Sequence, residues 1–188
     1  DRFNDSFEGR AHGMLLDVTR RDEIDEAISF VNGKYEVDVL VNNAGYGLAG
    51  AIEETSIEEC REIFEANFFG TLQITQRILT IMRSQKPGHI IQVSSHGGFK
   101  SFAGFGIYNA SKFALEGITD TLRLELAGTA IRIILIEPGP IDTRFRANSR
   151  AAFEREVDLQ NSRFAKTYEA MLKRLGSENP TAQFTLEP

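Results

Sequence analysis

The amino-acid sequence predicts an α/β fold in which parallel strands alternate with helices. Three short apolar runs have the length of buried strands, and each ends in a cluster of small, polar or proline residues. The runs are residues 37–41, 89–93 and 131–136. Helical stretches lie between them, and this alternation is typical of a parallel sheet with crossover helices.

The remaining elements follow from apolar spacing. Helical periodicity predicts helices over residues 21–32, 57–85, 107–127 and 151–175, with a kink at 67–70. Thr55 and Glu58 have the spacing of a capping box, which predicts where the second helix begins.

A phenol and an ammonium stand one helical turn apart in Tyr108-Asn-Ala-Ser-Lys112. Residues at i and i+4 share a helix face, so the ammonium can lower the pKa of the phenol and make it a proton donor and acceptor. By itself this spacing is weak, because it usually marks a partly solvated helix face. Ser95 strengthens it, since it follows the 89–93 strand, and open α/β sheets bind ligands beyond the carboxyl ends of their strands. The set indicates carbonyl or alcohol chemistry.

Two plainer readings of these motifs stay open. Ser94 is an alternative hydroxyl at the same strand end, although no Gly-x-Ser-x-Gly elbow surrounds either serine to suggest a hydrolase. The segment Asn42-Asn-Ala-Gly45 is either an ordinary turn or a place where a ligand approaches the backbone closely.

Taken in order, the motifs resemble those of the short-chain dehydrogenases/reductases, which are nicotinamide-dependent oxidoreductases. The matching residues are Asp17-Val18, Asn42-Asn-Ala-Gly45, Asn67 in Asn-Phe-Phe-Gly70, Ser95, Tyr108-x-x-x-Lys112, and Pro138-Gly139 with Ile141 and Thr143. The resemblance extends to about Arg144. It implies a Rossmann-type doubly wound parallel sheet with helices on both faces, in a single domain over residues 1–188. Residues 144–175 would then be a helical substrate lid.

The resemblance also implies a role for each matching residue. Tyr108 would be the general acid and base, Lys112 would lower its pKa and bond the nicotinamide ribose, and Ser95 would hold the substrate oxygen. Asn67 would hold a water in a proton relay. The expected cofactor-binding residues are Asp17, Val18, Asn43, Ala44, Gly45, Tyr108, Lys112, Pro138, Gly139, Ile141 and Thr143. The cofactor would be NADP or NAD, and the resemblance slightly favours NADP.

Members of this family begin with a strand and a Thr-Gly-x-x-x-Gly-x-Gly turn that binds the pyrophosphate at a helix N-terminus. No such segment occurs in this sequence, so we expect the chain to be incomplete at its N-terminus, and at its C-terminus after residue 188 as well. The resemblance further implies that residues 14–17 are the third strand of the family, which would then lack its neighbours in the sheet. The residues that distinguish NAD from NADP belong to that segment. The sequence therefore leaves the choice between the two cofactors open.

Composition narrows the class of protein. The formal net charge of −6 disfavours a nucleic-acid partner, and no run approaches the roughly 20 apolar residues that span a membrane. The single Cys60 excludes an internal disulfide and suits a reducing compartment, so we expect a cytoplasmic protein. His12, His89 and His96 lack metal-ligand spacing, and no metal is expected.

The sequence thus favours an NAD(P)-dependent oxidoreductase acting on a small carbonyl or alcohol substrate. Aromatic residues in 144–175 hint at an apolar substrate, although packing of the helix on its own domain gives the same pattern. By resemblance, the helices that carry Asn67 and Tyr108 would pair in a homodimer or homotetramer. Two alternatives remain: a non-catalytic binding or scaffold protein on the same fold, and a sugar-nucleotide epimerase, which the short tail disfavours.

Overall fold

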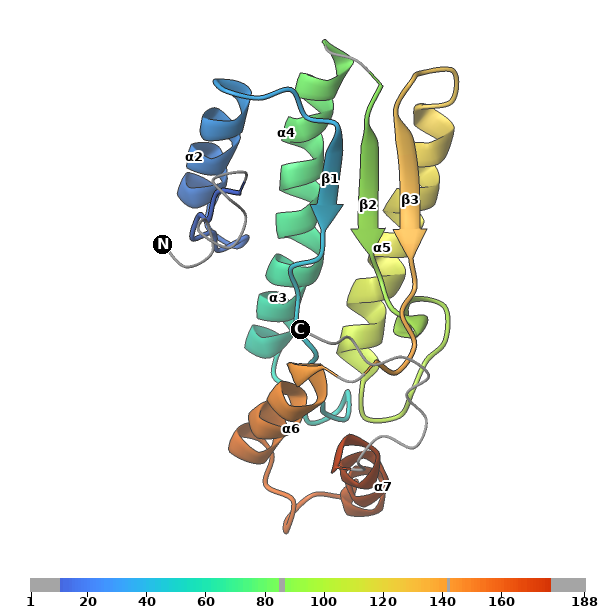
Figure 1. Cartoon of the computed structure of the whole chain (residues 1–188). Helices are drawn as coiled ribbons and strands as arrows, with labels where there is room; N and C mark the ends of the chain where they lie inside the picture. The colour runs from blue at the N-terminus through green and yellow to red at the C-terminus, as the bar shows by residue number, and fades with distance from the viewer. Residues whose placement is uncertain (1–10, 85–86, 142, 177–188) are drawn as a thin grey trace.

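Three parallel strands form the sheet at the centre of the computed structural model, which describes residues 11–84, 87–141 and 143–176. The strands are β1 (Val39–Asn42), β2 (His89–Val93) and β3 (Arg132–Ile136), in the order β1-β2-β3 (Figure 1). Val39 pairs with His89, and His89 pairs in turn with Arg132. The three predicted strands are confirmed, and their carboxyl ends lie at one edge of the sheet.

Three helices pack on one face of this sheet: α2 (Arg21–Asn32), α4 (Thr71–Arg83) and α5 (Gly106–Glu125) (Figure 1). Alternate side chains of the strands meet these helices because successive residues of a strand point to opposite faces. The resulting apolar core consists of Ile78, Ile81, Met82, Ile90, Leu126 and Ile131. The side chains that point to the other face, those of Val39, Val41, Ile134 and Ile136, are exposed among the described residues.

The predicted kink is a π-helical segment. Helix α3 (Ile57–Phe64) runs into the π-helix η1 (Glu65–Gly70), which runs directly into α4. At Gly70 the helix touches the preceding chain so closely that a Cβ there would lie 2.4 Å from the Val18 carbonyl oxygen. Helix α4 ends at Arg83, and the expected end at Gln85 lies outside the described residues.

The predicted capping box was wrong by one residue. Ser56, not Thr55, is the N-cap of α3: its Oγ accepts a hydrogen bond from the Glu59 amide at 3.2 Å, and its own amide donates to Glu59 Oε2 at 2.8 Å. The Thr55 hydroxyl instead donates to the Ala51 carbonyl at 2.9 Å. Both spacings satisfy the sequence rule, and the preceding turn at Ala51 decides between them.

Residues 14–17 do not form the predicted strand. A strand needs a hydrogen-bonded neighbour, and no described strand lies beside this segment; Leu15 is 93% exposed. Instead the segment leads into α2, where the Asp17 amide donates to Glu23 Oε2 at 2.6 Å and the Arg20 amide donates to the Asp17 carbonyl at 3.0 Å.

The tail predicted as one helix is two helices, α6 (Arg144–Glu156) and α7 (Ala165–Gly176), placed beyond the carboxyl ends of the strands (Figure 1). Helix α6 begins earlier than predicted because Thr143 Oγ1 accepts a hydrogen bond from the Phe145 amide at 3.3 Å. It ends where Val157 is extended and the Asp158 carboxylate accepts from the Gln160 amide at 3.2 Å. This local turn competes with helix continuation.

Helix α7 is hydrogen-bonded, through Tyr168, to the segment that follows β1; we call these bonds the Tyr168 tie. The Tyr168 hydroxyl accepts a hydrogen bond from the Ala51 amide at 2.9 Å and donates to Glu54 Oε2 at 2.7 Å. The Ser162 hydroxyl donates to the same carboxylate at 2.8 Å. Around this tie lies a second apolar cluster, built from Ala49, Ala51, Phe153, Tyr168 and Met171.

A buried polar triad joins β1, β2 and α4. The Asn42 amide donates to Thr75 Oγ1 at 2.9 Å and to Gln92 Oε1 at 3.0 Å, and the Gln92 amide donates to Thr75 Oγ1 at 3.2 Å. The Thr75 hydroxyl itself donates a hydrogen bond to the Thr71 carbonyl at 2.8 Å. All three side chains are buried, so the triad satisfies polar groups that would otherwise be costly inside the core.

Replacing Thr75 by valine tests this triad. The substitution keeps the shape but leaves the Asn42 and Gln92 amides short of an acceptor, so we expect the free energy of unfolding to fall by about 1–3 kcal/mol. Urea denaturation measures the loss. Thr80→Val on the exposed side of α4 is the control, and we expect it to stay within about 0.5 kcal/mol of the parent. Equal losses in the two variants would contradict the role of the triad.

Candidate active site

Ser95 and Tyr108 converge at the carboxyl end of β2. Ser95 is the N-cap of the short helix η2 (His96–Gly98), and its Oγ accepts a hydrogen bond from the Gly97 amide at 3.1 Å. A Cβ on Gly97 would lie 3.2 Å from the Tyr108 ring and 3.5 Å from Ser95 Oγ. A side chain at Gly97 would therefore crowd the space between the two groups, and both hydroxyl-bearing residues are buried.

Lys112 lies one turn after Tyr108 on the buried face of α5. Its ammonium donates a hydrogen bond to the Val93 carbonyl at 3.0 Å, which fixes the helix to the last residue of β2. Burial disfavours the charged form and lowers the pKa of Lys112 from 10.5 to about 8, and the Glu116 carboxylate acts in the opposite direction. An ammonium with this pKa can change its charge just above neutral pH.

The pKa of the Tyr108 phenol is raised from its ordinary value, mainly because burial disfavours the phenolate, while a hydrogen bond with Ser95 lowers it in part. Lys112 is not among the causes of this shift, and its ammonium donates a hydrogen bond to the Val93 carbonyl. The phenol is therefore held in its protonated form, which is the form that can donate a proton. A lowering of the Tyr108 pKa by Lys112 stays a prediction.

Asn67 lies in η1, fully buried, and binds the backbone of the loop after β1. Its Oδ1 accepts from the Tyr46 amide and its Nδ2 donates to the Tyr46 carbonyl, both at 3.0 Å. The same Nδ2 donates to Ser111 Oγ at 3.1 Å. A Cβ on Gly45 would lie 2.7 Å from Asn67 Oδ1 and 3.8 Å from Lys112 Nζ, so the side chains of Asn67 and Lys112 both approach this glycine.

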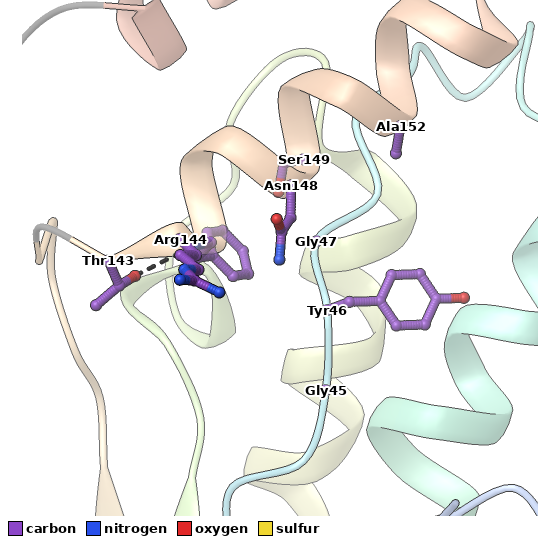
Figure 2. A pocket seen from close by; sticks show the side chains of 9 residues that line it. Gly45, Tyr46, Gly47, Thr143, Arg144, Asn148, Ser149 and Ala152 are labelled. Carbon is purple, nitrogen blue, oxygen red and sulfur yellow. Dashed lines mark hydrogen bonds between the residues drawn. The ribbon is translucent and has the colours of Figure 1, made fainter.

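A cavity of about 410 Å³ opens beside these residues, between the 45–47 segment and the first turns of α6. Figure 2 shows its lining, with Gly45, Tyr46 and Gly47 on one side and Thr143, Arg144, Asn148, Ser149 and Ala152 on the other. The Phe145 ring also lines it and packs on Tyr108, with 5.7 Å between the ring centroids. The first turns of α6 thus cover the phenol.

The residues predicted to bind a cofactor fall into several groups. Asp17, Val18 and Ala44 line a second, more open hollow of about 510 Å³, while Gly45 and Thr143 line the first cavity. Pro138 follows β3, and its carbonyl accepts from the His96 amide at 3.0 Å. The remaining predicted residues line neither hollow in the described part of the chain; they are Asn43, Tyr108, Lys112, Pro138, Gly139 and Ile141.

The two hollows are lined by neighbouring residues of the segment after β1, Ala44 in one and Gly45 in the other. An extended dinucleotide needs such a run of open space along the carboxyl edge of a sheet. The Asp17 carboxylate accepts from the Thr19 amide at 2.9 Å, and this bond lowers its pKa, so it stays an acceptor near neutral pH. The hollows offer room and polar groups for part of a nicotinamide dinucleotide, and the sequence holds no Gly-rich turn for its pyrophosphate.

Sequence reasoning missed several residues of the site. Tyr46 holds Asn67 through its backbone, Ser111 holds it through a hydroxyl, and Phe145 covers Tyr108. Contacts made through backbone atoms do not depend on the residue type, so the sequence gave no indication that Tyr46 belongs to the site. Gly97 was visible in the sequence only as a turn residue after Ser94-Ser95, although its lack of a side chain keeps the site open.

The sequence predicts neither a metal site nor a membrane-spanning helix. Within residues 11–84, 87–141 and 143–176, no three His, Cys, Asp or Glu side chains gather as metal ligands. In the same ranges no helix is both long and apolar enough to cross a bilayer.

Comparison with known proteins identifies similar chains. The family model described as short chain dehydrogenase matches residues 2–154. The 3-ketodihydrosphingosine reductase of Bacteroides thetaiotaomicron is 34% identical over 90% of this chain and 62% of its own length. Human retinol dehydrogenase 8 is 41% identical over 69% of this chain and 41% of its own length. The chain thus spans less than two thirds of either curated relative.

A solved structure shares the fold. A variant of actinorhodin polyketide ketoreductase, determined with NADPH, superposes with a TM-score of 0.74 at 29% identity, covering 92% of this chain and 67% of that one.

The pKa of Lys112 predicts a pH-dependent stability. Its value is about 8 in the folded protein and 10.5 in the unfolded chain, so between these pH values the unfolded chain binds more protons. The free energy of unfolding of the parental protein should therefore rise between about pH 8 and 10.5 compared with that of the Lys112→Met variant. The total rise should be about 3 kcal/mol. Urea denaturation of both proteins across this range measures the difference. A difference that stays constant with pH would contradict the lowered pKa.

Proposed function

Because the chain belongs to the short-chain dehydrogenase family, we propose that it carries the catalytic centre of an NAD(P)-dependent oxidoreductase acting on a carbonyl or alcohol. The observation that supports this most is the burial of Tyr108 and Lys112 on one face of α5, opposite Ser95 at the end of β2. The relatives reported above are named as a reductase and a dehydrogenase, which favours an enzyme over a scaffold.

In the proposed reaction, Tyr108 donates its proton to the substrate oxygen during reduction and takes a proton in the reverse direction. Ser95 donates a hydrogen bond to the same oxygen and holds it in place. Lys112 supplies a positive charge beside the developing negative charge, and Asn67 keeps the loop after β1 in position. The bound nicotinamide would supply or accept the hydride.

The proposed cofactor site runs along the two hollows. Asp17, Val18, Asn43 and Ala44 would hold the adenosine side, while Gly45 and Thr143 would hold the nicotinamide side together with Pro138, Gly139 and Ile141. NADP is the favoured form, supported by the ketoreductase structure with NADPH. Both hollows would have to fill for the nicotinamide to come near Tyr108.

An apolar substrate is the proposed class. The named relatives act on 3-ketodihydrosphingosine and on retinol, as their names state. In this chain Phe145 and Ala152 supply apolar surface to the cavity beside Tyr108. We propose that residues 144–175 act as the lid over such a substrate, with α7 held by the Tyr168 tie.

A homodimer or homotetramer and a cytoplasmic location complete the proposal. Exposed apolar side chains on the helical face, Phe69, Phe113 and Leu124, support association of two copies. The single Cys60, half-buried and unpaired, supports a reducing compartment.

Replacing Tyr108 by phenylalanine in the full-length protein tests the role of the phenol. The variant keeps the ring but loses the proton donor, so we expect turnover to fall by about 100-fold or more while cofactor affinity changes only a few-fold. Nicotinamide absorbance measures turnover, and fluorescence titration measures affinity. Tyr35→Phe, on the surface after α2, is the matched control and should keep parental turnover. Turnover retained by the Tyr108 variant would remove it from proton transfer.

Titration with NADPH and with NADH tests the cofactor. We expect NADPH to bind at least about tenfold more tightly, a difference of about 1.4 kcal/mol. Nicotinamide fluorescence of the full-length protein reports both affinities. Tighter binding of NADH would assign NAD, and binding of neither would contradict the proposed oxidoreductase.

A further inference from the structure

The face of α5 that carries Tyr108 and Lys112 carries a third ionisable group, Glu116, one turn further along. The spacing of four residues places Glu116 and Lys112 on the same helix face. Oε1 of Glu116 is buried and has no hydrogen-bond partner among the described residues. Burying a carboxylate oxygen in this way is costly, so its position needs an explanation.

The surroundings of Glu116 place it at the same strand end as the Lys112 ammonium. A Cβ on Gly98 would lie 2.5 Å from Glu116 Oε1 and 2.5 Å from Ser94 Oγ, so both oxygens converge on this glycine. The Ser94 hydroxyl is buried and, like Oε1, makes no hydrogen bond of good geometry. The Lys112 ammonium is bound to the carbonyl of Val93, the residue before Ser94.

The charges around Glu116 come from three elements. Lys112 and Asp120 flank it on α5, Glu137 faces it from the end of β3, and the Ser94 hydroxyl faces it from the end of β2. Burial raises the pKa of Glu116 most; Ser94 opposes this, while the two neighbouring carboxylates add to it.

We propose that Glu116 is a positioning residue whose carboxylate keeps the Lys112 ammonium charged at the pH where Tyr108 works. The inference rests on the proposed oxidoreductase function. Burial drives Lys112 toward its neutral form, and Glu116 is the group on the same helix face that opposes this change. Glu116 makes no contact with a reacting atom and acts only through Lys112.

The titration of Lys112 tests the proposal without any need for turnover. The free energy of unfolding is measured across pH for the protein with Lys112 and for Lys112→Met, and the difference between the two gives the midpoint of the Lys112 titration. The same pair is then measured in the Glu116→Gln background. We expect Glu116→Gln to lower the midpoint from about 8 by about one pH unit. An unmoved midpoint would overturn the proposal, whether or not the enzyme turns over.

Three further variants make the test specific. Glu116→Asp keeps the charge and should return the midpoint to near its parental value. Glu125→Gln makes the same charge change at an exposed site on α5, so it should leave the midpoint unmoved. An equal shift in that variant would show that the effect comes from net charge alone, and it would overturn the proposal. Glu116→Ala should behave as Glu116→Gln does, which keeps the test available if the glutamine variant does not fold.

The pH profile of kcat/KM then connects this charge to the reaction. The alkaline limb should move to lower pH in Glu116→Gln by the same amount as the Lys112 midpoint. A shifted midpoint with an unshifted alkaline limb would overturn the positioning role. Absence of turnover in the parental protein would contradict the proposed function, while the Lys112 midpoint would still decide whether Glu116 holds its charge.

Discussion

The hydrogen bond from the Lys112 ammonium to the Val93 carbonyl is the interaction on which the rest of the site depends. It fixes α5 against the end of β2, which places Tyr108 beside Ser95. A buried ammonium tolerates this position because it donates a hydrogen bond to a backbone oxygen at the strand end. The bond therefore serves the packing of the fold and the arrangement of the site together.

The same physical constraint applies at two other places in the interior, where buried polar side chains find hydrogen-bond partners. Thr75 satisfies Asn42 and Gln92 between the sheet and α4, and Asn67 satisfies the backbone of Tyr46. These networks hold the loop after β1 in one conformation, and that loop forms a wall of the cavity beside Tyr108. The hydrogen bonds that satisfy these buried polar groups therefore also shape the cavity.

Much of the fold could be predicted from the sequence because apolar periodicity and turn residues are local signals. The three strands and α2 appear nearly where they were predicted, and the break at Asn67 is the π-helix. The strand at 14–17, which the family resemblance implied, did not form, because a strand depends on a neighbour and no described strand lies beside this segment. The tail was predicted as one helix because the turn at Asp158 depends on its side chain binding the backbone.

For the site, Tyr108, Lys112 and Ser95 came together as predicted, but the direction of the Lys112 ammonium, and with it the pKa of Tyr108, depends on tertiary structure.

The π-helix has a consequence for which residues of the α3–η1–α4 rod face the core. In an uninterrupted α-helix, the twelve steps from Ile63 to Thr75 would leave the two side chains about 120° apart. One extra residue taken up by the wider turn reduces this to about 20°, and both side chains are in fact fully buried. A deletion of one residue within 65–70 would leave eleven regular steps between Ile63 and Thr75, and these also keep the two side chains about 20° apart. Such a deletion would leave the core-facing sides of the rod in register and remove the wide turn that carries Asn67.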